Sequence, residues 1–338
     1  MTVPPRPIVV LGCPRSGTTL LQVALHSHPR IAVPPETRLL VAAYRARLSF
    51  GDFRDPAARD RFADWVLARR AVRDLGVPRK ELRRRVQAAP PTLGSALAAV
   101  LRAYADRFGR PRWGDKRPGY YRDVAAVRRL LPTAQFVHLV RDPRACVASL
   151  SQVPWWDAGT PAALATWMEA QDLGARWRRR LGPQTWHELR YEDLVRDPDT
   201  VLRDLCTFLG EDYDPAMAAT HTTAGTAVPE RKTWHRRTAQ PIGPDRVSAY
   251  LDVLPAEDLA LVERVAGRRM AALGYEVGAR DRVPPALLAE YARTATHRRL
   301  VHLRRHARDV LRDARLRQPV AAVEPDGDGR PSGPAVRR

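Results

Sequence analysis

Residues 7–19 read Pro-Ile-Val-Val-Leu-Gly-Cys-Pro-Arg-Ser-Gly-Thr-Thr, and this stretch decides the fold of the 338-residue chain. The apolar run at residues 7–11 ends in a glycine and is followed by an apolar-periodic stretch at residues 20–25. This pattern predicts a buried strand that turns into a helix. A strand followed directly by a helix is the opening unit of an α/β fold.

Two further strand candidates are residues 136–140, Phe-Val-His-Leu-Val, and residues 185–189. Apolar residues at three-to-four spacing predict helices at residues 57–75, 92–108, 121–131, 161–181 and 255–273. Short strands separated by helices favour a parallel sheet that helices cover on both faces. We therefore expect an α/β fold of three α/β/α layers, with a central parallel sheet of four to five strands and many covering helices.

The C-terminal part of the chain has a different character. Residues 284–317 form one long basic amphipathic pattern, and residues 318–338 are rich in Gly, Pro and Asp. The second of these segments has too few apolar residues to bury the surface that folding requires. We expect one globular domain at residues 1–283, a basic helical extension at residues 284–317 and a disordered tail at residues 318–338.

The formal net charge is +20, which favours an acidic partner such as nucleic acid. Two observations argue against that interpretation: the basic residues are nearly all arginine, and nine arginines are concentrated between residues 293 and 317. The three cysteines are widely and irregularly spaced, which fits neither a zinc site nor a disulfide framework. The N-terminus shows no signal-peptide core. We expect a cytoplasmic protein with reduced thiols and no nucleic-acid partner.

The loop at residues 12–19 has the spacing G-x-x-x-x-G-T-T, with Thr18 where a nucleotide triphosphatase has lysine. A loop of this length turns backbone N–H groups and the positive end of a helix toward an oxyanion. Arg15 offers a cation in place of the lysine, which argues against triphosphate chemistry. The alternative is a strand-to-helix turn that is simply rich in small residues.

Residues 14–19, Pro-Arg-Ser-Gly-Thr-Thr, resemble the 5′-phosphosulfate loop of the sulfotransferase superfamily, whose fold is P-loop-like and whose donor is 3′-phosphoadenosine 5′-phosphosulfate (PAPS). The resemblance implies a set of donor-binding residues, namely Arg15, Ser16, Gly17, Thr18 and Thr19. Residues 140–149, Val-Arg-Asp-Pro-Arg-Ala-Cys-Val-Ala-Ser, resemble the 3′-phosphate motif of the same family, which assigns Arg141 and Ser149 to that phosphate. Taken alone, this second motif also fits a surface Arg-Asp pair.

Two further segments are similar to protein-tyrosine sulfotransferases and their bacterial relatives. Residues 34–39, Pro-Pro-Glu-Thr-Arg-Leu, imply that Glu36 is the general base, although a salt bridge or a helix-start carboxylate would also explain this residue. Residues 113–118, Trp-Gly-Asp-Lys-Arg-Pro, contain Lys116, one of three lysines, which would stabilise the leaving group beside Arg15. A sulfuryl group carries less negative charge than a phosphoryl group, so we expect no metal.

Weaker similarities involve Tyr191, within the Arg-Tyr-Glu-Asp-Leu segment, and a late loop at residues 233–242. They imply that Tyr191 lies near the nucleotide and that Arg236, Arg237 and Thr238 close over it. A buried strand-end tyrosine explains Tyr191 equally well. The chain has Val153 where tyrosine sulfotransferases carry an arginine, and we expect no membrane anchor like theirs. The acceptor therefore stays open: a hydroxyl of a sugar, glycolipid, natural product or peptide.

The sequence leaves two other function classes open. The first is a basic anion-binding protein that uses residues 293–317 to engage membrane or nucleic acid. The second is a P-loop kinase-like enzyme, which the absence of the loop lysine disfavours. The extension either packs on the body as a solvated helix or rests on the anionic inner membrane face through its apolar residues, Leu300, Leu303, Val310 and Leu311. The sequence does not predict an oligomeric state.

Overall fold

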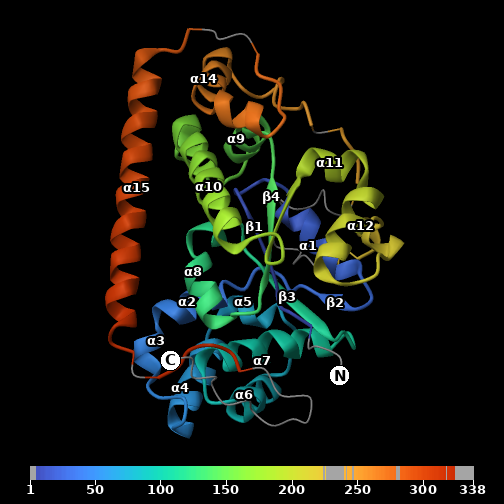
Figure 1. Ribbon diagram of the computed structural model, residues 1–338, viewed down its shortest axis with the longest axis vertical. Helices are drawn as coiled ribbons and strands as arrows, with labels where there is room; N and C mark the ends of the chain where they lie inside the picture. The colour runs from blue at the N-terminus through green and yellow to red at the C-terminus, as the bar shows by residue number, and fades with distance from the viewer. Residues whose placement is uncertain are drawn as a thin grey trace.

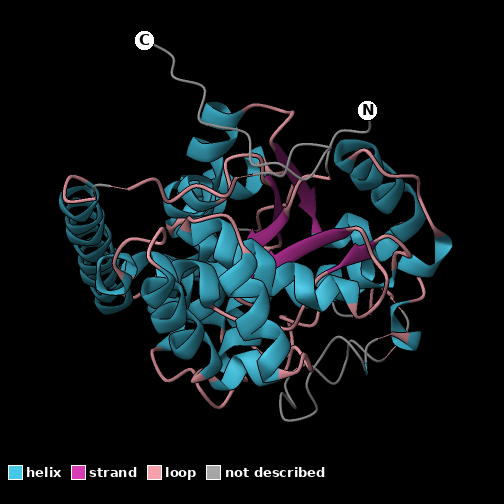
Figure 2. Cartoon of the chain, turned by 90° about the horizontal axis from the view of Figure 1, so that it is seen from below, coloured by secondary structure: helices cyan, strands magenta, loops and turns pink. Residues whose placement is uncertain are grey.

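The computed structural model describes residues 5–223, 225, 240, 242–245, 247–278, 282–316 and 318–323. A five-stranded sheet lies between layers of helices (Figures 1 and 2). The strands are β1 (Ile8–Gly12), β2 (Ile31–Ala32), β3 (Arg112–Lys116), β4 (Gln135–Val140) and β5 (Trp186–Arg190). Their order is β2-β3-β1-β4-β5 and every neighbouring pair is parallel. The predicted three-layer α/β fold is confirmed.

The helices predicted at residues 92–108, 121–131, 161–181 and 255–273 are confirmed, and the structure has further helices that the sequence pattern did not predict. In chain order the helices are α1 (Thr18–Ser27), α2 (Leu39–Arg45), α3 (Arg47–Phe50), α4 (Pro56–Leu67), α5 (Arg70–Arg73), α6 (Arg79–Ala88), α7 (Leu93–Asp106), η1 (Pro118–Arg122), α8 (Val124–Leu130), α9 (Pro143–Ser151), α10 (Gly159–Leu181), α11 (Tyr191–Arg196), α12 (Pro198–Leu209), η2 (Pro215–Met217), η3 (Thr220–Thr222), α14 (Ala256–Ala272) and α15 (Pro285–Asp313). The helix expected at residues 57–75 is two helices, because Arg69 adopts an extended conformation that redirects the chain and buries Val72 and Leu75. None of the helices in the described part of the chain is long and apolar enough to cross a bilayer.

The two faces of the sheet bury separate hydrophobic clusters. Alternate residues of a strand point to opposite faces, so Val9 and Leu11 of β1 join one cluster while Ile8 and Val10 join the other. Helices α7, α8, α9 and α10 cover the first face, and α1, α11 and α12 cover the second. Because both faces are covered, the central strand β1 is completely buried, and the residues that follow it are held on a rigid base.

Strand β2 is only two residues long and strand β3 carries no apolar pattern, so neither strand was predicted. β3 reads Arg-Trp-Gly-Asp-Lys, yet all five residues are buried. The sheet tolerates Arg112 because its guanidinium donates to the backbone oxygens of Arg6 and Leu209 and to the side chain of Gln135. A buried polar side chain that is fully hydrogen-bonded avoids the desolvation penalty that an unpaired one would pay.

Helix α15 runs along one side of the molecule and packs against α10 (Figure 1). Its C-terminal end is fixed by Asp313, which accepts hydrogen bonds from the Tyr44 hydroxyl at 2.7 and 2.8 Å. Asp313 also forms an ion pair with Arg47 at 2.7 Å, and the side chain of Arg47 is fully buried. Burial and the neighbouring carboxylate raise the pKa of Tyr44, so its hydroxyl remains a donor.

After α15 the chain returns along α7 (Figure 1). Gly94 donates its backbone N–H to the Val320 oxygen at 2.8 Å, and Ala322 donates to the Leu130 oxygen at 2.7 Å. A Cβ at Gly94 would lie 2.3 Å from the Ala322 nitrogen, so only glycine permits this approach. Residues 318–323, the first part of the predicted disordered tail, therefore belong to the folded body in this structure. Residues 324–338 lie outside the described part.

The Asp313 anchor predicts a large stability difference between two acids of α15. Asp313→Ala leaves the buried Arg47 without its nearest carboxylate, so we expect it to lower the free energy of unfolding by about 3 kcal/mol. Asp309 lies 3.9 Å from Arg47 and is more exposed, so Asp309→Ala should cost less than about 1 kcal/mol. Urea unfolding of both variants measures the difference. Equal losses of unfolding free energy in the two variants would contradict the role of Asp313 in fixing the end of α15.

Candidate functional site

All five strands end at the same edge of the sheet, and each is followed by a residue that the sequence singled out. Because the strands are parallel, the order across this edge is the strand order. From β2 to β5 the residues are Glu36 after β2, Lys116 at the end of β3, residues 13–19 after β1, Arg141 after β4 and Tyr191 after β5. The topology therefore places the five predicted segments side by side in one row.

The loop after β1 has the backbone of an anion site. Arg15 and Gly17 have positive φ angles of 71° and 100°, and the chain turns sharply before α1 begins at Thr18. Helix α1 has no side-chain cap and no acidic residue in its first turn. The first N–H groups of a helix lack intrahelical partners and carry partial positive charge. An anion bound at this loop would provide both the missing cap and the missing charge.

Gly17 also makes room for a neighbouring ring. A Cβ at this position would lie 2.5 Å from Cδ2 of Tyr191 and 3.3 Å from a methyl group of Leu139. The aromatic ring of Tyr191 therefore packs directly on the loop, and only glycine fits both the left-handed conformation and the contact.

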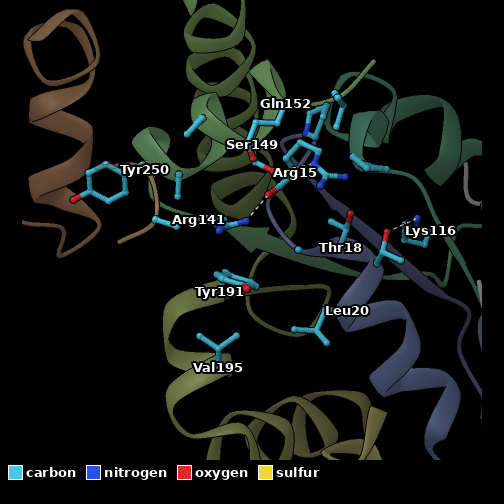
Figure 3. A pocket seen from close by; sticks show the side chains of 18 of the residues that line it. Arg15, Thr18, Leu20, Lys116, Arg141, Ser149, Gln152, Tyr191, Val195 and Tyr250 are labelled. Atoms are coloured by element: carbon cyan, nitrogen blue, oxygen red, sulfur yellow. Dashed lines mark hydrogen bonds between the residues drawn. The ribbon is translucent and has the colours of Figure 1, made fainter. Parts of the chain in front are cut away.

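Arg15 links the loop to the last turn of α9. Its Nε donates to Ser149 Oγ at 3.0 Å, while Nη1 of Arg141 donates to the Arg15 backbone oxygen at 3.0 Å (Figure 3). The Arg141 guanidinium lies 4.2 Å from the centre of the Tyr191 ring, within the range of a cation–π interaction. The two predicted phosphate motifs, which are distant in sequence, are thus connected through side chains.

Ser16 differs from its neighbours in the loop. Its side chain is fully buried and its backbone N–H donates to the Cys13 oxygen at 3.0 Å. The hydroxyl lies beneath the loop, 2.7 Å from where a Cβ on Gly12 would stand, and it does not line the cavity. Ser16 therefore shapes the loop, whereas the side chains of Arg15, Thr18 and Thr19 line the cavity.

Glu36 and Lys116 lie together on the other side of the loop. The Lys116 Nζ is 3.8 Å from Glu36 Oε2 and donates to Thr19 Oγ1 at 3.3 Å. Glu36 Oε1 is 3.4 Å from Nε of Arg38 and 3.8 Å from Nε of Arg117. Figure 3 shows Arg15 and Thr18 between Arg141 on one side and Lys116 on the other. The Glu36 carboxylate is thus surrounded by the cationic side chains of three residues, Lys116, Arg38 and Arg117.

A buried carboxylate supports the segment that contains Glu36. Asp115 accepts hydrogen bonds from the Tyr120 hydroxyl and, at 3.5 Å, from Thr37 Oγ1. Thr37 in turn accepts from the Leu39 backbone N–H at 3.2 Å, at the start of α2. Burial raises the pKa of Asp115, and the nearby Glu36 carboxylate adds to this effect. Asp115 thus ties the Glu36 segment to β3, next to Lys116.

These residues line a cavity of about 920 Å³, a volume typical of small-molecule sites. Among the described residues, six cationic side chains face the cavity, against the two carboxylates of Glu36 and Asp245; the cations are Arg15, Arg38, Lys116, Arg117, Arg122 and Arg141. Arg15 and Arg38 are also the two non-glycine residues with positive φ in the described part of the chain. Such strained conformations cluster at functional sites.

Several lining residues were not predicted from the sequence. Arg117 was within a quoted segment, directly after Lys116, and its charge was a usable signal. Arg38 likewise stood within the quoted segment at residues 34–39, whereas Arg122 and Tyr250 carried no signal of their own, because tertiary packing alone brings them to the cavity. Arg122 is held by a two-pronged ion pair with Glu169 at 2.9 and 2.6 Å.

The late loop is described only in part. Arg236, Arg237 and Thr238 lie outside the described residues. Gln240 and Ile242, which end the same loop, line the cavity.

Comparison with protein families matches residues 7–215 to the sulfotransferase family. The nodulation protein NoeE of Sinorhizobium fredii is 32% identical over 241 residues, which cover 63% of this chain and 52% of that protein. Protein-tyrosine sulfotransferase A of Caenorhabditis elegans is 22% identical over 281 residues, covering 80% of this chain and 68% of that protein. This chain thus spans about half the length of the first of these relatives.

Among solved structures, the fold is similar to the sulfotransferase domain of the Synechococcus PCC 7002 olefin synthase. The TM-score is 0.59 at 24% identity, over 82% of this chain and 98% of that domain. The sulfotransferase domain of the curacin biosynthetic pathway gives a TM-score of 0.53 at 21% identity, over 81% of this chain and 99% of that domain. These structures share the fold described above.

The Gly17 contact predicts a specific intolerance of side chains. In Gly17→Ala the positive φ and the overlap with Tyr191 add, and we expect a loss of about 3 kcal/mol in unfolding free energy. Gly109 also has a positive φ, of 62°, but nothing lies within 4 Å of its would-be Cβ. Gly109→Ala should therefore cost only about 1 kcal/mol. Thermal unfolding compares the two, and an equal loss would show that Tyr191 does not restrain the loop.

Proposed function

The chain belongs to the sulfotransferase family, and from this premise we propose that it transfers a sulfuryl group from PAPS to a hydroxyl acceptor. One observation carries the proposal: the Arg15–Ser149 hydrogen bond joins a loop suited to a 5′-phosphosulfate to the segment at residues 141–149, which is suited to a 3′-phosphate. A donor with two separate anionic groups, as PAPS has, would use both ends of this arrangement. A nucleoside triphosphate carries all its phosphates at one end.

In this proposal the donor lies along the sheet edge. The phosphosulfate takes the N–H groups at the start of α1 and the side chains of Arg15, Thr18 and Thr19. Arg141 and Ser149 bind the 3′-phosphate, and Tyr191 packs near the nucleotide. The volume of the cavity and its excess of cations suit a ligand of this size and charge. Arg236, Arg237 and Thr238 remain proposed donor contacts on sequence resemblance alone.

The reaction is an in-line displacement at sulfur. The acceptor oxygen forms a new S–O bond, its proton passes to Glu36, and the bond from sulfur to the bridging oxygen breaks. Adenosine 3′,5′-bisphosphate leaves with the electron pair of that bond. Positioning and charge stabilisation supply most of the rate enhancement in such transfers.

Lys116 and Glu36 have complementary roles in this step. Lys116 stabilises the charge that develops on the bridging oxygen, together with Arg15. Glu36 needs hydrogen-bond reach to the acceptor oxygen. The ion pair between Glu36 and Lys116 is long, at 3.8 Å, so exchanging it for contacts with the reacting groups costs little. The cationic side chains around the loop provide the positive charge that a metal ion supplies in phosphoryl transfer, and the proposal therefore includes no metal.

The acceptor is a hydroxyl of a sugar, glycolipid, natural product or peptide, and we place the enzyme in the cytoplasm. Donor consumption against panels of these four classes would identify the acceptor. The name of one relative, a protein-tyrosine sulfotransferase, is the reason to include tyrosine peptides in the panel.

A direct test of the donor is competition between nucleotides: tighter binding of magnesium ATP than of adenosine 3′,5′-bisphosphate would reject the proposal in favour of a kinase.

The two-phosphate arrangement predicts a ligand-dependent effect of Arg141. We expect Arg141→Ala to weaken adenosine 3′,5′-bisphosphate about tenfold to hundredfold, because a charge-assisted bond to the 3′-phosphate is lost. Adenosine 5′-monophosphate, which lacks that phosphate, should lose much less affinity. Titration calorimetry with both ligands separates the 3′ contact from damage to the loop.

A matched control for this experiment is Arg203, whose guanidinium lies over the Tyr213 ring at 4.6 Å, outside the residues that line the cavity. Arg203→Ala should leave both affinities unchanged. Equal losses for the two ligands in Arg141→Ala would assign Arg141 to loop support only.

The base assignment predicts a rate effect without a binding effect. Glu36→Gln keeps the shape of the side chain but cannot take a proton, so kcat for sulfuryl transfer should fall about 100-fold or more. Affinity for adenosine 3′,5′-bisphosphate should change little. Asp245→Asn, which alters the second carboxylate of the cavity, serves as the control. Wild-type turnover by Glu36→Gln would remove Glu36 from the mechanism.

A further inference from the structure

Helix α15 keeps an apolar strip on the face turned away from the body. We define the outer strip as Leu300, Leu303, Val310 and Leu311, whose exposed fractions are 47%, 55%, 50% and 64%. At about 100° per residue these four positions fall within an arc of about 100° on one side of the helix. They are half of the eight large hydrophobic residues that are exposed in the described part of the chain. Packing within the protein does not account for this concentration.

The opposite face of α15 already has its partners. Leu287, Leu288 and Tyr291 pack against the main core cluster. Arg298 forms an ion pair with Glu169 at 2.7 Å, and Asp313 binds Tyr44 and Arg47. Both views show the helix at the periphery of the molecule, with no other element on its outer side (Figures 1 and 2). The outer strip is therefore not needed to hold the helix in place.

Charge is distributed unequally between the two faces. Exposed arginines border the outer strip, with Arg304 and Arg308 on one edge and Arg299 on the other. Within the described residues, no carboxylate lies within ion-pair distance of these three side chains. Asp309 and Asp313 are instead turned toward Arg47 of the body. Along the outer strip this face thus combines apolar and cationic groups, while Asp309 and Asp313 are used inside. The third acid of the helix, Glu290, is exposed but lies ten residues before Leu300.

We propose that the outer face of α15 binds an anionic lipid surface, with the outer strip inserted among the acyl chains and the flanking arginines on the headgroups. A helix with this division of residues lies in the plane of a membrane interface. Nucleic acid would bind the arginines but offers nothing to the leucines. A second copy of the chain would bring two rows of arginines together. Only a lipid surface satisfies both parts of the face.

Vesicle co-sedimentation of the full chain tests this proposal. We expect binding to vesicles that contain about one third phosphatidylglycerol, weak binding to pure phosphatidylcholine, and a decrease with added salt. Leu300→Ser/Leu303→Ser/Leu311→Ser should reduce the partition coefficient about fivefold for each residue, because roughly half of each leucine remains to be buried. Arg304→Gln/Arg308→Gln should reduce it about fivefold for each charge.

Matched controls distinguish binding through the outer face from nonspecific effects of total charge and of exposed apolar surface. Lys80→Gln/Arg264→Gln removes the same charge from exposed sites elsewhere, and Leu48→Ser/Val277→Ser removes exposed apolar residues elsewhere. Both should bind vesicles like the wild type. Because all the altered side chains are exposed, circular dichroism and thermal unfolding should show every variant folded.

Three results would overturn the proposal. The first is wild-type protein that does not bind anionic vesicles. The second is binding that the outer-strip variant and the controls change equally. The third is that the outer-strip substitutions leave vesicle binding unaffected but abolish another association. That association would be either self-association, seen by sedimentation velocity, or binding to a DNA duplex. Affinity for adenosine 3′,5′-bisphosphate is measured in parallel, so failure of the lipid site is distinguishable from failure of the donor site.

Discussion

The parallel direction of the five strands is the constraint on which the site depends. With β1 in the middle of the order β2-β3-β1-β4-β5, the loop at its end has neighbours on both sides. Strands β2 and β3 bring Glu36 and Lys116 to one flank, and β4 and β5 bring Arg141 and Tyr191 to the other. The proposed reaction and the proposed nucleotide recognition are therefore separated along one line, with Arg15 in contact with the recognition side through Ser149. A strand exchanged or reversed in this order would separate groups that have to work within a few ångströms of each other.

The sequence predicted those parts of the fold that local pattern determines. β1 is a continuous apolar run, β4 is apolar apart from Gln135 and His138, and α7, α10 and α15 show clear helical periodicity, so each could be predicted without a neighbour. β3 could not, because its burial depends on partners from remote segments, such as the Leu209 oxygen that accepts from Arg112. The residues of the site differ in the same respect, since some stand in local motifs and others depend on tertiary packing. Glu36, Lys116 and Arg141 stand in recognisable motifs, whereas Arg122 and Tyr250 reach the cavity only through the packing of η1 and the segment before α14.

The large positive charge of the chain is used mainly within the protein. Arg47, Arg112 and Arg144 are buried, and each is paired or hydrogen-bonded to groups from distant parts of the sequence. Exposed arginines of α6 are matched by Glu81, Asp60 and Asp64. The net charge of the chain is therefore a poor indicator of a polyanionic partner. Positive charge exceeds negative charge locally, in the cavity and along the outer face of α15.

The return of the chain along α7 also has a consequence for how the protein is made. Val323 donates to the Ser95 hydroxyl although the two residues are 228 positions apart, and Val320 accepts from Gly94 at the start of the same helix. During translation α7 emerges from the ribosome long before these partners are synthesised. The start of α7 and the adjoining end of α8 thus stay incomplete until the last segment arrives, and chaperones that recognise exposed backbone and apolar surface would have this region available throughout elongation.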